Sequence, residues 1–81
     1  MKEDVREFFL ETIHPNLRLI QTLESIEELC RSIQLSGQTE PIHVWFDGWR
    51  FRIVDGEKRW RACRKLGMTT VKAVIVEVTA Y

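Results

Sequence analysis

The chain has 81 residues, 44% of them hydrophobic, and its twelve basic and twelve acidic side chains give a formal net charge of zero. This length suits a single small domain over residues 1–81 with a modest core. The sequence has no apolar run of transmembrane length, and its acidic start lacks the pattern of a signal peptide, so we expect a cytoplasmic protein with no membrane partner. Cys30 and Cys63 stand apart, which favours two buried thiols over a zinc site or a disulfide framework.

The zero net charge hides an uneven distribution along the chain. Residues 1–40 hold four basic and eight acidic side chains, whereas residues 41–81 hold eight basic and four acidic ones. The two halves therefore carry about −4 and about +4 charges. This pattern favours a local site for a phosphate or another anion in the second half over a general coating of positive charge.

The first half predicts a strand, a connector and a helix. Residues 5–10 are expected to form a strand, with a short helix as the alternative because their apolar positions lack a clean period. The His-Pro pair at 14–15 disfavours helix and begins an extended connector. Apolar residues then recur at three- and four-residue steps and predict a helix over 23–36, with Ser25 opening a Ser-x-x-Glu capping box and Gly37 just past the end.

A β-hairpin is predicted over residues 42–54. The Asp-Gly pair at 47–48 is a strong turn signal between two runs of strand-forming residues. In the second run, aromatic or apolar residues alternate with arginines: Trp49, Phe51 and Ile53 against Arg50 and Arg52. The arginine face indicates a surface for nucleic acid or an acidic partner, while Trp49 is expected to stack on a base, pack in the core or lie at a dimer interface.

A second helix over 57–66 and a final strand within 70–78 complete the predicted order. Apolar residues of the helix share one face, Gly67 follows its end, and the last segment is rich in β-branched residues. The fold class is therefore α+β, a small domain whose mixed sheet includes a β-hairpin and is accompanied by two main helices. The order of elements is strand, helix, hairpin, helix, strand.

The start of the second helix carries the chemistry. The first turn of a helix exposes backbone N–H groups and a partial positive charge, which favour an anion. Gly56 allows close approach, and Lys58, Arg59 and Arg61 add positive charge beside those amides. The alternative is a solvated helix whose charges only maintain solubility, with Glu57 paired to Arg61 four residues on.

The sequence resembles the N-terminal domain of ParB proteins, within the ParB/sulfiredoxin superfamily. A Gly-x-x-x-Pro element spans Gly37 to Pro41, and the Gly-Glu-Arg-Arg-x-Arg-Ala box of the family appears at residues 56–62, with Lys58 in place of an arginine. The segments that carry the resemblance are "IHPN" at 13–16, "SIEELCRSIQLSGQTEP" at 25–41, "FRIVDGEKRWRACRKLG" at 51–67 and "VKAVIVEV" at 71–78.

This resemblance implies a domain that binds CTP with the arginine-rich box at the triphosphate and that acts in DNA partition or transcription-linked regulation. ATP is the other nucleotide we consider, Mg²⁺ would arrive with the nucleotide rather than on protein ligands, and DNA and a second copy of the chain are the expected partners. The implied phosphate- or nucleotide-binding residues are Gly37, Gln38, Thr39, Gly56, Glu57, Lys58, Arg59 and Arg61.

Two other functions remain open at this point. Free-serine kinases of the same superfamily share Asp55, Gly56 and Arg59, so a phosphotransferase would use Asp55 or Glu57 as a base or a metal-linked carboxylate. The same carboxylates would also allow weak hydrolysis of a bound nucleotide. Sulfiredoxin activity is not expected, because Glu57 occupies the position of its catalytic cysteine. The remaining alternative is a protein-interaction module without a ligand, in which Arg61 and Arg64 dock an acidic partner.

Overall fold

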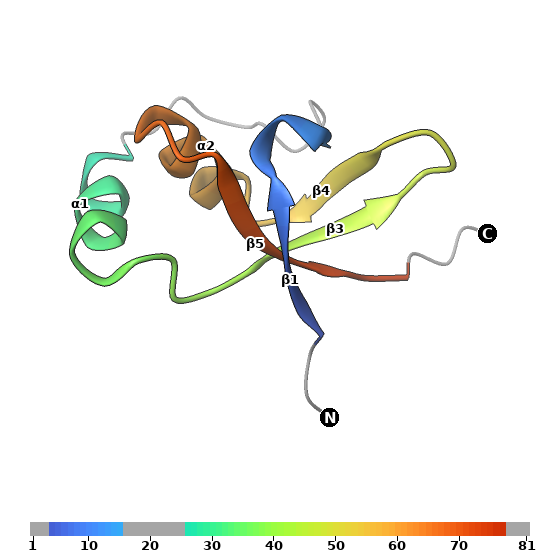
Figure 1. The fold of residues 1–81 in the computed structure, drawn as a ribbon, viewed down its shortest axis with the longest axis horizontal. Helices are drawn as coiled ribbons and strands as arrows, with labels where there is room; N and C mark the ends of the chain where they lie inside the picture. The colour runs from blue at the N-terminus through green and yellow to red at the C-terminus, as the bar shows by residue number, and fades with distance from the viewer. Residues whose placement is uncertain (1–3, 16–25, 78–81) are drawn as a thin grey trace.

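The computed structural model describes residues 4–15 and 26–77, which form a five-stranded mixed sheet accompanied by two α-helices (Figure 1). The predicted α+β fold class is thus confirmed. The strands are β1 (Val5–Phe9), β2 (Ile13–His14), β3 (Ile42–Phe46), β4 (Phe51–Asp55) and β5 (Thr70–Ile75). The helices are α1 (Glu27–Ser36), α2 (Glu57–Lys65) and the 3-10 helix η1 (Leu10–Thr12). No helix in these two ranges has the length and apolar character that a membrane crossing requires.

The sheet is curled because one continuous segment supplies both of its outer strands. The strand order is β1-β5-β3-β4-β2, with β1 antiparallel to β5, β5 parallel to β3, β3 antiparallel to β4, and β4 parallel to β2. Only η1 separates β1 from β2, and a 3-10 helix of this length spans about 6 Å. The two edges must therefore approach each other, and the ring of Phe8 in β1 lies 5.1 Å from the ring of Phe51 in β4.

The core lies between the sheet and the two helices. Cys63 is fully buried, Cys30 is also buried, and both are free thiols as the sequence predicted. Burial raises the pKa of the Cys63 thiol, which keeps it protonated and unreactive. The other buried residues of this core are Ile13, Ile26, Ile33, Ile42, Val44, Ile53, Trp60, Ala62, Val71 and Ala73.

Three local features differ from the sequence prediction. The strand β2 was not predicted, since two residues give no periodic signal. Helix α1 begins at Glu27, after Ile26 as its N-cap, rather than at residue 23. The proposed capping residue Ser25, and most of the predicted connector, fall in 16–25, outside the described residues. Trp49 lies in the turn before β4 and not in the strand, because β4 begins at Phe51.

Candidate functional site

The start of α2 is formed by a glycine in a conformation that other residues avoid. Gly56 follows directly after β4 and has φ 95° and ψ 25°, in the left-handed region. A Cβ atom at this position would lie 2.8 Å from Cγ2 of Ile42 and 3.1 Å from Nη1 of Arg59. Glycine is therefore required here both for the backbone angle and for the close approach of β3 to the first turn of α2.

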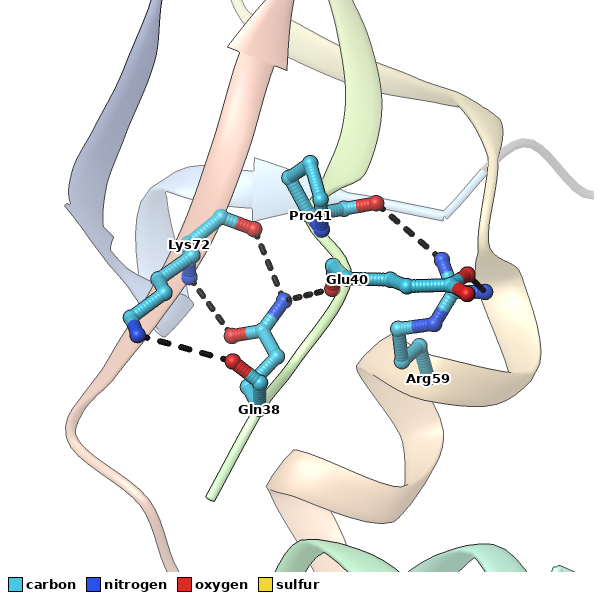
Figure 2. A network of polar contacts seen from close by, with 5 residues as sticks. All are labelled: Gln38, Glu40, Pro41, Arg59 and Lys72. Atoms are coloured by element: carbon cyan, nitrogen blue, oxygen red, sulfur yellow. Dashed lines mark hydrogen bonds and ion pairs between the residues drawn. The ribbon is translucent and has the colours of Figure 1, made fainter. Parts of the chain in front are cut away.

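Arg59 connects the first turn of α2 to the segment before β3. Its Nη1 donates a hydrogen bond of 3.1 Å to the carbonyl oxygen of Pro41, and its Nη2 donates one of 2.9 Å to Oε2 of Glu40 (Figure 2). The carboxylate side chain of Glu40 is 71% exposed, whereas the Arg59 side chain is mostly buried. The guanidinium of Arg59 is thus fixed by the carbonyl oxygen of Pro41, whereas the exposed carboxylate of Glu40 is held mainly by this ion pair.

Gln38 fixes the same segment to β5. Its side-chain Nε2 donates to the carbonyl oxygens of Lys72 at 2.8 Å and Glu40 at 3.0 Å, and its Oε1 accepts from the backbone N–H of Lys72 at 2.7 Å (Figure 2). The residue is 6% exposed. Because the whole amide is used by backbone groups, Gln38 sets the position of the segment beside Arg59.

A cavity of about 210 Å³ lies where this segment, α1 and Arg59 meet. It brings the candidate loop Gly37–Thr39 and Arg59 of the arginine-rich box together, although 20 positions or more separate them in the sequence. Lys58 and Arg61 are not among its lining residues. The lining consists of Leu29, Ser32, Ile33, Gly37, Gln38, Thr39, Glu40 and Arg59.

Arg61 faces a different side of α2 from Arg59. Two residues correspond to about 200° around a helix of 3.6 residues per turn. The Nη1 atom of Arg61 lies 3.9 Å from Oε2 of Glu57, one turn earlier. The Glu57 side chain is 13% exposed, and its Oε1 atom is buried without a hydrogen-bond partner. The structure therefore divides the basic box into Arg59 beside the cavity and a separate Glu57–Arg61 pair.

The remaining candidates lie at the surface, and sequence reasoning missed two contributors. Asp55 ends β4 and Lys58 lies in the first turn of α2, and both are exposed. Sequence reasoning overlooked Glu40 and the carbonyl oxygen of Pro41, which hold Arg59. An acid inside the Gly-x-x-x-Pro element was the available signal for Glu40.

Within 4–15 and 26–77, no group of three or more His, Cys, Asp or Glu side chains is placed to hold a metal ion.

Sequence comparison shows the family. The family model described as the ParB N-terminal domain matches residues 1–80. The chain belongs to the ParB N-terminal domain family. It is 41% identical over 78 residues to the nucleoid occlusion protein of Geobacillus kaustophilus, covering 91% of this chain and 28% of that protein. It is 37% identical over 81 residues to the chromosome-partitioning protein ParB of Myxococcus xanthus, covering 96% and 27%. The chain thus spans less than a third of these curated relatives.

Structural comparison confirms the ParB/sulfiredoxin-like fold. ParB from Caulobacter crescentus complexed with CTP-γ-S has a TM-score of 0.82 and 30% identity, with 93% of this chain and 45% of that chain covered. The same protein complexed to the centromeric parS site has a TM-score of 0.73. Sulfiredoxin from Arabidopsis thaliana has a TM-score of 0.81 and 28% identity, with 93% of this chain and 86% of that chain covered. A free serine kinase in complex with AMP has a TM-score of 0.80 and 26% identity, with 95% of this chain and 32% of that chain covered.

Proposed function

We propose that this domain binds a nucleoside triphosphate, CTP first and ATP second, in the cavity between residues 37–41 and the start of α2. The observation that carries the proposal is the position of Arg59, which lines the cavity beside Gly37–Thr39 from the first turn of the helix. The positive end of the helix dipole at this turn favours an anion. The C. crescentus ParB complexed with CTP-γ-S supports this assignment.

Phosphate binding is an exchange of partners at Arg59. The ion pair with Glu40 is partly exposed, and such pairs contribute only about 0–1 kcal/mol. A triphosphate carries more charge and offers arginine two parallel hydrogen bonds, so it replaces the carboxylate. Gly56 allows β3 to pack closely against this turn and Lys58 adds positive charge, while Glu57 and Arg61 form a separate pair on another side of α2. Mg²⁺ would enter on the phosphates of the nucleotide.

The wider role that we propose is DNA partition or a related nucleoid function in the cytoplasm. Its support is the family membership and the relatives, which are a nucleoid occlusion protein and a chromosome-partitioning protein. DNA and a second copy of the chain are the partners proposed for this role, with the ParB complex at parS as the support for DNA.

The test is a thermal-shift measurement with CTP and with ATP, each with Mg²⁺. We expect a nucleotide to raise the melting temperature and Arg59→Ala to abolish the shift. Arg64→Ala is the matched control, because Arg64 lies over the Trp60 ring at 5.5 Å and does not line the cavity. If neither nucleotide changes the melting temperature at millimolar concentration, the proposal fails. Retention of duplex DNA in a filter assay tests the second partner separately.

A phosphotransferase is the second candidate, favoured by one observation. Oε1 of Glu57 is a buried carboxylate oxygen without a hydrogen-bond partner beside the start of α2, and a free serine kinase shares the fold. In this reaction Glu57 or Asp55 would accept the hydroxyl proton of a small acceptor. Transfer of phosphate from ATP to serine, lost in Glu57→Gln, would support it, and a blank panel of hydroxyl acceptors would dismiss it. Thiol chemistry has no comparable support, because Cys63 is fully buried.

The third candidate, a protein-interaction module without a ligand, predicts a different experimental result. Charge reversal at Arg61 and Arg64 would then weaken capture of an acidic partner while every nucleotide assay stays blank. A nucleotide-dependent thermal shift that Arg59→Ala abolishes would exclude a module without a ligand.

A further inference from the structure

A second cavity, of about 370 Å³, lies at the turn of the β3–β4 hairpin. Figure 1 shows this turn at the end of the molecule opposite to α1, and α1 contributes Leu29, Ser32 and Ile33 to the lining of the cavity beside Arg59. We call it the hairpin pocket, and its lining consists of Thr12, His14, Phe46, Trp49, Arg50 and Phe51. None of the candidate phosphate-binding residues belongs to it.

Two aromatic side chains of the hairpin pocket face solvent. Trp49 is 80% exposed and Phe46 is 51% exposed. Phe51 packs against Phe46 with ring centroids 5.2 Å apart, and against Phe8 at 5.1 Å. The apolar wall is therefore anchored in the sheet, while its outer aromatic surface has no cover within the described residues. Exposed aromatic surface of this kind marks a binding site more often than a structural need.

Asp47 holds the turn in a fixed shape. Its Oδ1 accepts hydrogen bonds of 2.8 Å from the backbone N–H groups of both Trp49 and Arg50, and its Oδ2 accepts one of 2.5 Å from Nε of Arg52. The backbone that carries the indole and the Arg50 side chain is thus ordered before any ligand arrives. Order of this kind reduces the entropy that binding costs.

The charge of the hairpin pocket is positive. Within residues 4–15 and 26–77, Arg50 has no ion-pair partner, and no Asp or Glu lines the pocket. The nearby carboxylate of Asp47 is neutralised by Arg52. A ligand that fits must therefore combine a flat apolar group for the indole with a negative charge for the guanidinium.

We infer that the hairpin pocket binds a nucleotide unit of single-stranded nucleic acid, with the base stacked on Trp49 and its phosphate at Arg50. Aromatic side chains beside an arginine are the combination that single-strand binding proteins use. A duplex keeps its bases inside the stack and offers the indole no face. An acidic peptide satisfies Arg50, but its carboxylates leave the exposed faces of Trp49 and Phe46 uncovered. This inference does not depend on the nucleotide site at α2.

The test uses the full chain and fluorescein-labelled oligo(dT), with binding followed by fluorescence anisotropy at low salt. We expect Trp49→Ala to weaken binding about tenfold, within the range for loss of one stacked base. Trp49→Phe should retain most of the affinity, because it keeps an aromatic face. Arg50→Ala should weaken binding and reduce the salt dependence by about one phosphate contact. Arg31→Ala, at an exposed position of α1 outside both cavities, removes the same charge and should change nothing.

Three outcomes would overturn the inference. The first is no binding of oligo(dT), and the second is binding that survives both Trp49→Ala and Arg50→Ala. The third is a preference for poly-glutamate or duplex DNA over oligo(dT), lost in the same variants. Because Trp49 and Arg50 lie in a surface turn, thermal melts should show that the variants remain folded.

Discussion

The two cavities differ in how far the protein already satisfies their polar groups. Beside α2, Arg59 is held by Pro41 and Glu40, and Gln38 is fully bonded to backbone groups. At the hairpin, Arg50 and the Trp49 indole have no such partners within the described residues. A ligand at the first cavity must therefore replace protein contacts, whereas one at the hairpin adds contacts to an open surface. Ligand binding at the first cavity should therefore be sensitive to mutations that disturb packing. Ligand binding at the hairpin should be sensitive to mutations that remove the aromatic ring of Trp49 or the charge of Arg50.

The largest expected effect contrasts two glycines, one in each region. Gly56 and Gly48 both have positive φ, 95° and 92°, but a Cβ at Gly56 would meet Ile42 at 2.8 Å while nothing lies within 4 Å of Gly48. Gly56→Ala should destabilise the protein by about 3 kcal/mol, from backbone strain plus overpacking. Gly48→Ala should cost about 1 kcal/mol, from strain alone.

Urea unfolding of both variants measures this contrast. Equal losses of stability would mean that the approach of Ile42 to Gly56 is relieved by a small shift, and that the two regions are equally tolerant.

The second prediction concerns the buried amide beside Arg59. Gln38→Ala leaves the Lys72 N–H without its acceptor and two carbonyl oxygens without their donor, so we expect a loss of about 2 kcal/mol. Gln34→Ala, at an exposed position of α1, is the matched control and should be nearly neutral. Denaturant melts report both values, and a neutral Gln38→Ala would show that water replaces the amide.

The third prediction addresses the exchange of partners at Arg59. Glu40→Gln weakens the competing ion pair, so affinity for the nucleotide should rise about two- to fivefold, in line with the value of a partly exposed pair. Isothermal titration with CTP measures it, and Glu28→Gln on the exposed side of α1 controls for overall charge. A fall in affinity would mean that Glu40 positions Arg59 for the ligand instead of competing with it.

The smallest expected effect is a pH dependence at the hairpin turn. Hydrogen bonds from the Arg50 backbone and the Arg52 side chain lower the pKa of Asp47 from 3.8 to about 2. Because the folded-state pKa is the lower one, this stabilisation is complete above about pH 4 and is lost as the pH falls towards 2. Water screens charges at this surface turn, so the effect should be modest.

The measurement is urea unfolding of the wild type and Asp47→Asn between pH 2 and 6. The stability difference between the two proteins should shrink as the pH falls. A difference that stays constant over this range would assign the role of Asp47 to hydrogen-bond geometry and not to its charge.

Most of the fold could be predicted from local patterns. The hairpin follows from the Asp-Gly pair at 47–48, and α2 from the apolar face that contains Ala62 and Cys63, both fully buried. The two-residue strand β2 could not be predicted, because its pairing with β4 is set by the curl of the sheet. Trp49 was placed in a strand because alternation continues through it, but the hydrogen bonds of Asp47 end the turn one residue later.

The candidate site was predicted in outline from the sequence. The spacing of the box placed Arg59 and Gly56 at the start of a helix, which the structure shows. Composition alone did not separate Arg59 from Arg61, because their division depends on the rotation of α2 against α1 and β3. Composition also gave no means to see that Trp60 is buried in the core whereas Trp49 is exposed. Long-range packing fixes both features.

The continuous segment that supplies both outer strands also bears on how the protein is made. In the sheet, Val5 is paired with Val74, so β1 leaves the ribosome well before its partner β5. Until β5 emerges, β1 has no neighbour and the two edges cannot be joined. The described fold is therefore expected to form in one late step, after synthesis of residue 75, and not element by element during translation.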